Sequence, residues 1–448
     1  DPDWLASAEG TEVIAGNALA DGSEPIATVY SGHQFGSYNP QLGDGRAVLL
    51  GEVIARDGER YDIQLKGSGP TPYSRGGDGR SPLGPVLREY IVSEAMAALG
   101  IPSTRALAAV TTGERVYREE ALPGAVLARV ARSHIRIGTL QFFSARKDVE
   151  ALGLLVDHVL ARHYPGRAGE DNPALALLEE VVAGQAELVA RWQLVGFIHG
   201  VMNTDNMLLG CETVDFGPCA FMDGFHPDTV YSSIDQQGRY AYRNQPAIAH
   251  WNLAVMAQAL LPVLDADQDR ALAMAQEAID RFPDLFLAAH SRGLGEKLGF
   301  SVTDQEDSTL VEDLFTLMAD SKADFTLTFR RLAELADPEL PEESGTGAIY
   351  RLPDNLTPWL ERWRQRLARE PQPPSQRQQL MLRANPVYIP RNHLVEEAIQ
   401  AAVYRQDLTP FHRLVERLGA PREFDPEMAR FALPPEPEQV VRQTFCGT

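Results

Sequence analysis

The sequence predicts an α+β fold in two lobes, with a β-rich N-terminal third followed by a mostly helical remainder. Glycine is dense between residues 30 and 80, where short apolar runs separate the glycine clusters, as in strands joined by turns. From about residue 150 the apolar side chains recur with the period of a helix instead. Two lobes of this kind leave a cleft between them, which is a common place for a ligand.

The strands are predicted from apolar runs and from alternation. Residues 46–54 form an apolar run that predicts a strand. In residues 61–66 apolar and polar side chains alternate, which predicts a half-buried strand with Lys66 near its end, on the polar face. Two further strands are predicted over residues 107–111 and 125–130.

One helix is embedded among these strands. Ser81 is its predicted N-cap and Pro82 its first residue, because Ser caps helices and Pro suits the first helical position. Glu89 lies near the middle of this helix, and Gly100 ends it. Amphipathic segments then predict longer helices over residues 175–195, 246–264, 267–290 and 308–335.

Composition excludes several classes of protein. The formal net charge is −21, and this acidic excess disfavours nonspecific adhesion to nucleic acid or to an anionic membrane, so we expect neither as a partner. No apolar run approaches the length of a membrane span. The three cysteines (Cys211, Cys219 and Cys446) are too few for a disulfide framework and predict reduced thiols in an intracellular protein.

The first chemical motif is a lysine on a strand followed by a carboxylate on the next helix. Lys66 and Glu89 match the lysine–glutamate ion pair of protein kinases, in which the lysine grips phosphates. The alternative is a solvent-exposed lysine and an unrelated helix glutamate. The motifs that follow are therefore needed to decide whether Lys66 and Glu89 form such an ion pair.

The second motif joins a loop to the tripeptide Asp215-Phe216-Gly217. In kinases the Asp of this tripeptide holds Mg²⁺. His199 and Asn206 keep the spacing of the His and Asn in the kinase catalytic loop, but Val201 stands where kinases have the catalytic Asp. Valine accepts no proton, so Asp205 is the nearest carboxylate that can serve as the base.

The third motif is a set of glycines and arginines suited to phosphates. Glycines let backbone N–H groups approach phosphate oxygens, and arginine adds bidentate charge. The alternative for each arginine is a solvated surface residue. The candidate residues are Gly43, Gly45, Arg46, Asp78, Gly79, Arg129 and Arg136.

Five longer segments closely resemble the selenoprotein O (SelO or YdiU) family: YSGHQFG, QLGDGR, LKGSGPTPYSRGGDGR, GFIHGVMNTDNM and DFGPCAFMD. The resemblance runs from about Tyr30 to the C-terminal cysteine. It implies a kinase-like two-lobe fold and a bacterial, cytoplasmic protein. The implied division is an N-terminal arm (1–24), a kinase-like N-lobe (25–135), a kinase-like C-lobe (136–348) and a C-terminal helical extension (349–448).

The resemblance also implies an activity. Family members transfer AMP from ATP to Ser, Thr or Tyr hydroxyls of proteins, possible targets including the enzyme itself, with ATP flipped relative to kinases; UMP transfer with Mn²⁺ is associated with the bacterial branch. It implies that Gly43, Gly45, Arg46, Lys66, Asp78, Gly79, Arg129, Arg136 and Asp215 bind ATP, with Glu89 paired to Lys66. It further implies that Asn206 and Asp215 hold Mg²⁺ or Mn²⁺, and that Asp205 is the base.

Three alternatives stay open at this point. The chain is a protein adenylyltransferase, a conventional kinase that uses Asp205, or a scaffold that binds ATP without catalysis. In some relatives the C-terminal cysteine bridges to one in the segment after Asp-Phe-Gly. That segment has no cysteine around Tyr231 here, which leaves Cys219 as the candidate partner of Cys446.

Overall fold

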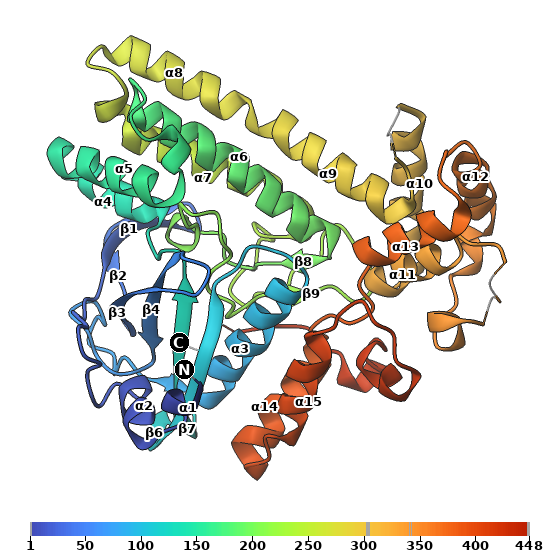
Figure 1. Ribbon diagram of the computed structural model, residues 1–448, viewed down its shortest axis with the longest axis horizontal. Helices are drawn as coiled ribbons and strands as arrows, with labels where there is room; N and C mark the ends of the chain where they lie inside the picture. Colours follow the sequence, from blue (N-terminus) through green and yellow to red (C-terminus); the bar gives the residue numbers. More distant parts are fainter. Residues whose placement is uncertain (1, 302–304, 340, 342, 446–448) are drawn as a thin grey trace.

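The computed structural model describes residues 2–301, 305–339, 341 and 343–445. It combines an N-terminal sheet with a long series of helices, so the α+β prediction agrees with the observed mixture of elements (Figure 1). The five-stranded antiparallel sheet has the order β3-β4-β7-β5, with β6 paired to β7. Its strands are β3 (Ala47–Ile54), β4 (Arg60–Lys66), β5 (Ser81–Pro82), β6 (Arg105–Tyr117) and β7 (Ala121–Ala131).

Strand β4 departs from the predicted half-buried strand, because its polar side chains are buried. Asp62 is 4% exposed and Gln64 is 0% exposed. They are buried because each meets a charged partner: Arg162 donates to Asp62 at 2.7 Å, and Arg129 donates to Gln64 at 2.6 Å. The register places Gln64 opposite Arg129, so Lys66 and Arg129 come from adjacent strands. The polar face of β4 therefore points into the protein, where its side chains meet charged partners.

The predicted irregular arm at the N-terminus is wrong in its local structure. Residues 1–24 contain α1 (Pro2–Leu5) and α2 (Ala8–Ile14). Ser7 caps α2 by accepting from the backbone N–H of Gly10, and Val13 and Ile14 pack against apolar residues of the sheet. Burial of two side chains at the end of a short helix thus anchors this segment.

A separate hairpin precedes the sheet. It consists of β1 (Val29–Gln34) and β2 (Ser37–Gly43), which pair antiparallel. β1 contacts α4 (Ile137–Ala145) and the short 3₁₀ helix at Thr204–Asn206. The hairpin therefore joins the strand-rich part of the chain to the loop that carries Asp205.

Helix α3 (Leu83–Ala98) is the predicted embedded helix, but its N-terminus differs from the prediction. Ser81 and Pro82 form the short strand β5 against β7, so Ser81 does not cap the helix. Pro82 occupies the N-cap position and makes no side-chain capping bond. Glu89 is buried on α3, on the side that faces Lys66.

The four longer segments predicted as helices are helical, with two interruptions. The segment 267–290 divides at Arg281, before Pro283, and the segment 308–335 divides where Asp324 caps a new helix. The helices are α5 (Val149–His163), α6 (Pro173–Leu194), α7 (Gln245–Leu264), α8 (Gln268–Asp280), α9 (Phe282–Leu298), α10 (Gln305–Ser321), α11 (Phe325–Glu334), α12 (Thr357–Leu367), α13 (Pro374–Ala384), α14 (Asn392–Arg405) and α15 (Thr409–Leu418).

Helix α7 lies in the one long, apolar segment among the described helices that could span a membrane. The segment Tyr242–Leu264 is long and apolar enough to cross a membrane by length and composition alone. Half of its most apolar window is buried inside the protein, and a buried core helix has the same composition. Leu253, Met256 and Leu260 on α7 belong to the largest hydrophobic core. The expectation that no apolar run approaches the length of a membrane span was therefore wrong for this segment.

The C-terminal helices cover the outer side of α3. Figure 1 shows α14 and α15 beside α3, and their apolar residues share one hydrophobic core. Arg391, 0% exposed, donates to Asp223 at 2.6 Å and to Asp324 at 2.5 Å. From α3, Arg88 donates to the carbonyl oxygen of Gly217 at 3.0 Å and to Asn392 on α14 at 2.8 Å. The two arginines thereby bind the C-terminal helices to the segment after Asp215.

Candidate active site

A cavity of about 610 Å³ lies between the sheet, the β1–β2 hairpin and the loop after α6. Its size is that of a site for a small-molecule ligand or cofactor. It is lined by all the residues that the sequence analysis assigned to nucleotide, metal or base: Gly43, Gly45, Arg46, Lys66, Asp78, Gly79, Glu89, Arg129, Arg136, Asp205, Asn206 and Asp215. The structure therefore brings these residues together, and their individual roles stay predictions.

The lysine–glutamate pair is formed. Lys66 Nζ lies 2.5 Å from Glu89 Oε2 and 2.7 Å from Asp215 Oδ1. Burial favours the neutral acid of Glu89, but the positive charges of Lys66 and Arg129 outweigh it and lower the pKa of Glu89. Lys66 is therefore a fixed cation at the centre of the cavity wall, and the alternative of an exposed lysine is excluded.

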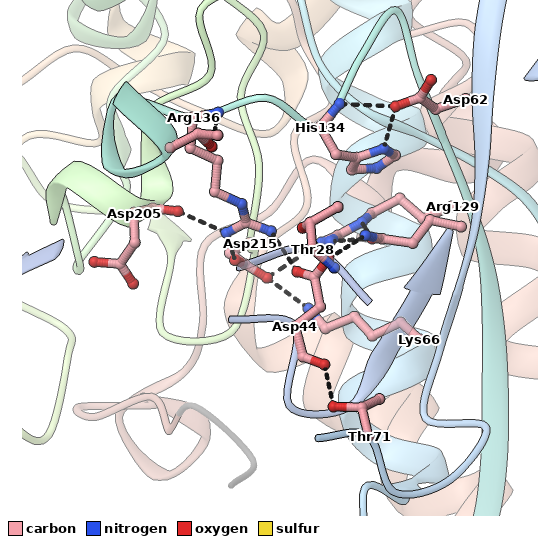
Figure 2. A network of polar contacts seen from close by, with 12 residues as sticks. Thr28, Asp44, Asp62, Lys66, Thr71, Arg129, His134, Arg136, Asp205 and Asp215 are labelled. Atoms are coloured by element: carbon pink, nitrogen blue, oxygen red, sulfur yellow. Dashed lines mark hydrogen bonds and ion pairs between the residues drawn. The ribbon is translucent and has the colours of Figure 1, made fainter. Parts of the chain in front are cut away.

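Two arginines lie beside this pair. Arg129 Nη1 donates to Glu89 Oε1 at 3.0 Å and to Asp215 Oδ1 at 3.2 Å. Arg136 Nη1 donates to the backbone oxygen of Asp205 at 2.6 Å and to Asp215 Oδ2 at 3.4 Å (Figure 2). Both residues are 2% exposed, so neither is the solvated surface residue of the alternative interpretation.

Asp215 is the point at which these cations meet. It contacts Lys66, Arg129 and Arg136 at once. Burial opposes its ionisation, but the three positive charges hold the pKa of Asp215 well below its usual value. Asp215 has a φ of 64°, a left-handed conformation that is uncommon for a non-glycine residue and that is often found at functional positions.

Asp205 has a different environment. It is 7% exposed, its Oδ1 has no hydrogen-bond partner among the described residues, and Gln34 Nε2 reaches its Oδ2 only at 3.4 Å. Burial raises the pKa of Asp205 to about 6, although the charge of Arg136 works in the opposite direction. A carboxylate with a pKa close to neutral pH is well suited to take up a proton.

The hairpin holds the loop of Asp205 in place. The backbone N–H of His33 donates to Thr204 Oγ1 at 2.8 Å, and that of Phe35 donates to Asn203 Oδ1 at 3.0 Å. The hydroxyl of Tyr240 donates to the same Asn203 oxygen at 2.6 Å. The loop that carries Asp205 is therefore positioned by segments that are far from it in the sequence.

Asn206 fits the role of a metal ligand. Its side-chain Nδ2 donates to the carbonyl oxygen of Val201 at 2.9 Å, so the group left for a ligand is the amide oxygen, the atom that hard cations prefer. Asp215 adds an ionised carboxylate. Within the described residues no three His, Cys, Asp or Glu side chains lie close enough to hold a metal by themselves. A bound cation would therefore need further oxygen ligands, such as phosphate groups and water.

The glycine turn at residues 43–46 is covered by a loop. Thr71 Oγ1 donates to the backbone oxygen of Asp44 at 2.7 Å, and Ser74 Oγ donates to that of Gly45. Tyr73 lies so close to Gly43 that a Cβ there would come within 2.4 Å of its ring. Glycine at this position allows loop and turn to form one wall of the cavity.

Asp78 is held differently from the other predicted residues. It pairs with Arg118 at 2.8 Å at the outer end of the cavity, and the hydrogen bonds from Arg118 lower the pKa of Asp78. The sequence analysis missed Arg118, because its partner lies forty residues earlier in the chain.

The sequence analysis also missed Asp44, which is buried and lies 3.4 Å from Arg136. Asp44 could have been identified from the sequence, because it is a charged residue between the two predicted glycines, Gly43 and Gly45. The proposed bridge between Cys219 and Cys446 cannot be described, because Cys446 lies outside the described residues. Cys219 itself is buried.

Comparison with known proteins gives the family. A model of the family described as protein adenylyltransferase SelO matches residues 3–419. The chain belongs to the SelO family. The protein nucleotidyltransferase YdiU of Rhodopseudomonas palustris strain BisB5 is 58% identical over 449 residues, covering 100% of this chain and 91% of the relative. The protein of the same name from Bradyrhizobium diazoefficiens is 57% identical, and that from Methylorubrum populi is also 57% identical, with the same coverage.

Membership of the SelO family makes the chain an enzyme of the nucleotidyltransferase class. A nucleotide is therefore its substrate. The cavity brings together three cationic side chains of the kind that bind phosphate groups.

Proposed function

We propose that this enzyme transfers AMP from ATP to Ser, Thr or Tyr hydroxyls of proteins, and that ATP binds with its β- and γ-phosphates buried and its α-phosphate facing Asp205. The observation that carries the proposal is the pair of buried guanidinium groups, Arg129 and Arg136, around Asp215. The names of the relatives, protein nucleotidyltransferase and protein adenylyltransferase, support a protein acceptor.

The position of the arginines supports a reversed nucleotide. Residues 132–136 connect β7 to α4, and the cavity wall beside them carries Arg129 and Arg136. A purine base prefers an apolar or aromatic wall, whereas guanidinium groups bind phosphate oxygens in pairs. The inner end of the cavity is therefore better suited to a pyrophosphate than to adenine. We also propose that the two parts of the chain form a kinase-like pair of lobes, divided near residue 135.

Asp205 supports the role of general base. Its buried carboxylate takes the proton of the acceptor hydroxyl while that oxygen forms a bond to the α-phosphorus. The bond between the α-phosphorus and the bridging oxygen to the β-phosphate breaks, and pyrophosphate leaves. Lys66, Arg129 and Arg136 stabilise the negative charge that develops on this leaving group.

A divalent cation, Mg²⁺ or Mn²⁺, would be held by Asn206 and Asp215, whose donor atoms fit a hard metal ion. When bound, it neutralises phosphate charge. Asp215 would then exchange its contacts with Lys66, Arg129 and Arg136 for the cation, which releases those three groups to hold the triphosphate.

The experiment that tests the proposal uses ATP labelled separately at the α- and γ-positions, with protein acceptors and the enzyme itself. Label from the α-position on the acceptor, with none from the γ-position, is the expected result. Label from the γ-position would favour a conventional kinase. ATP binding without label on any protein would favour a scaffold. UTP labelled at the α-position, with Mn²⁺, measures the competing transfer of UMP.

A further inference from the structure

A cluster of aromatic rings and one arginine borders the cavity on the side of Asp205, and the proposed chemistry does not use it. Its rings follow one another at contact distance: Tyr38 lies 5.0 Å from His33, and His33 lies 5.3 Å from Trp251, between ring centroids. Phe35 lies 5.2 Å from Tyr240. We call this cluster the aromatic rim, and it consists of His33, Phe35, Tyr38, Arg239, Tyr240 and Trp251.

Three rings of the aromatic rim are open to solvent, whereas Tyr240 is buried with 1% exposure. Phe35 is 38% exposed, Tyr38 is 42% exposed and Trp251 is 36% exposed. Ile234, beside the cavity, is 53% exposed. Adjacent exposed rings together with arginine are typical of surfaces that bind another protein, where Trp, Tyr and Arg are enriched.

The aromatic rim is fixed to the loop that carries the base. Phe35 and Asp205 line the same cavity, and Gln34, the neighbour of Phe35, donates to the Asp205 carboxylate. Phe35 and Tyr240 both donate to Asn203, two residues before Asp205. The chain segment around an acceptor hydroxyl that reaches Asp205 from this side therefore lies on the rim.

Arg239 is the charged member of the aromatic rim. Its guanidinium lies 5.0 Å from the centroid of the Trp251 ring and 5.8 Å from that of Tyr240. Within the described part of the chain it forms no ion pair, and its Nε is buried without an acceptor. The nearby carboxylate of Asp235 instead accepts from the backbone N–H groups of Arg239 and Tyr240.

A stacked guanidinium of this kind can still take up an anion. A cation–π contact uses a face of the guanidinium, so the terminal N–H donors that Tyr240 does not engage remain at its edge for a carboxylate. By contrast, Arg129 and Arg136 in the cavity are already paired with acids.

We propose that Arg239 binds the side-chain carboxylate of an Asp or Glu next to the acceptor hydroxyl, so that the enzyme prefers acidic acceptor segments. The inference rests on the function proposed above and specifies its class of substrate. Arg239 is in this view a specificity residue, which contacts the acceptor segment and leaves the transfer step to Asp205.

Binding is tested first, with peptides that cannot react. Two fluorescein-labelled eleven-residue peptides carry a central alanine, flanked by Asp in one and by Lys in the other. Their affinities for the full chain are measured by fluorescence anisotropy. We expect the wild type to prefer the Asp peptide by roughly tenfold, R239E to reverse the preference, and R239K to keep part of it.

The matched control is R243E, which makes the same charge change in an exposed ion pair with Asp228 at 2.7 Å. It should leave the preference unchanged. The same ratio of affinities in R239E as in the wild type, equal affinities of the wild type for both peptides, or binding of neither peptide would overturn the inference.

The transfer assay separates this inference from the proposed function. The same peptides with a central serine are incubated with ATP labelled at the α-position. If the peptides bind according to their charge but neither is labelled, the proposed transfer is contradicted and the site for acidic segments is supported. Label on both peptides at equal kcat/KM would leave the proposed function standing and remove the role of Arg239.

Discussion

The carboxylate of Asp205 lies against the backbone of Gly32. A Cβ at position 32 would come within 2.6 Å of Asp205 Oδ1 and within 2.9 Å of Leu42 Cδ1. Gly32 is part of β1, so the hairpin and the proposed base fit together only where a side chain is missing. The position of the Asp205 carboxylate thus depends in part on Gly32, which has no side chain.

Gly32→Ala should therefore impair catalysis without removing the nucleotide site. The added methyl group displaces the Asp205 carboxylate, and we expect kcat for transfer to fall by about 10²-fold. Binding of a non-hydrolysable ATP analogue, measured by calorimetry, should change by less than about threefold, because Lys66 and Arg129 do not contact Gly32.

Gly153→Ala on α5 is the control for this change, because nothing lies within 4 Å of the added Cβ. Its kcat should equal that of the wild type. Unimpaired turnover by Gly32→Ala would show that the position of Asp205 does not limit the rate.

The pH dependence of transfer should report the ionisation of Asp205. Its pKa is raised to about 6 by burial, and only the ionised form accepts a proton. The rate should therefore rise with pH, reach half its maximum near pH 6, and stay level between pH 7 and 8. Initial rates at saturating ATP measure this profile, and a flat profile between pH 5 and 7 would argue against Asp205 as the base.

Asp205→Asn should abolish transfer and stabilise the fold at alkaline pH. Because the folded pKa of about 6 exceeds the unfolded value of 3.8, stability is fully present below pH 3.8 and lost as pH rises through 6. Asn carries no charge, so the variant should gain up to about 3 kcal/mol at pH 8 and nothing near pH 4. Denaturant unfolding at both pH values measures the difference, and a variant less stable at pH 8 would contradict the expectation.

Asp215→Asn should separate nucleotide binding from transfer. Without its carboxylate charge, the three cations that now contact position 215 remain free to bind a triphosphate. We expect the affinity for ATP in the presence of EDTA to be kept or increased, while metal-dependent transfer falls by at least about 10³-fold. Calorimetry and the α-label assay measure the two effects. Turnover like that of the wild type would refute the role of Asp215 in holding a metal.

Val201→Asp restores a carboxylate at the position that kinases use, but it should not create a kinase. Val201 lines the cavity and is 7% exposed. If the α-phosphate faces the acceptor, a base at position 201 has no γ-phosphate to act on. We expect no label from the γ-position on any acceptor, with Val201→Asn as the control for size and polarity. Efficient γ-transfer would instead indicate a nucleotide in the kinase orientation.

The residues of the candidate site were predictable because each belongs to a short segment whose chemistry is local. Lys66 ends an alternating run, Asp215 starts a recognisable tripeptide, and Asn206 keeps a fixed spacing from His199. All twelve assigned residues line one cavity, even though they come from positions 43 to 215. The outline of an N-terminal sheet and later helices followed from the change of apolar period.

The residues that were missed depend on partners far along the chain. Asp44 pairs with Arg136, 92 residues later, and the buried Asp62 is compensated by Arg162 and His134, which also lie far along the chain. Periodicity assigns such polar residues to the outer face of a strand, because it contains no information about distant cations. The burial of α2 likewise depends on two side chains, Val13 and Ile14, which are too few to produce a periodic signal.

The buried position of Arg391 makes the fold around the cavity depend on a residue far beyond Asp215 in the sequence. A protein terminated by a frameshift before this residue would retain every atom of the nucleotide cavity, yet leave Asp223 and Asp324 without their shared counterion. Removing one partner of a buried ion pair costs about 3–5 kcal/mol, a large share of the total stability of an ordinary domain. Natural selection for turnover should therefore purge nonsense alleles even when they fall more than 150 codons after Asp215.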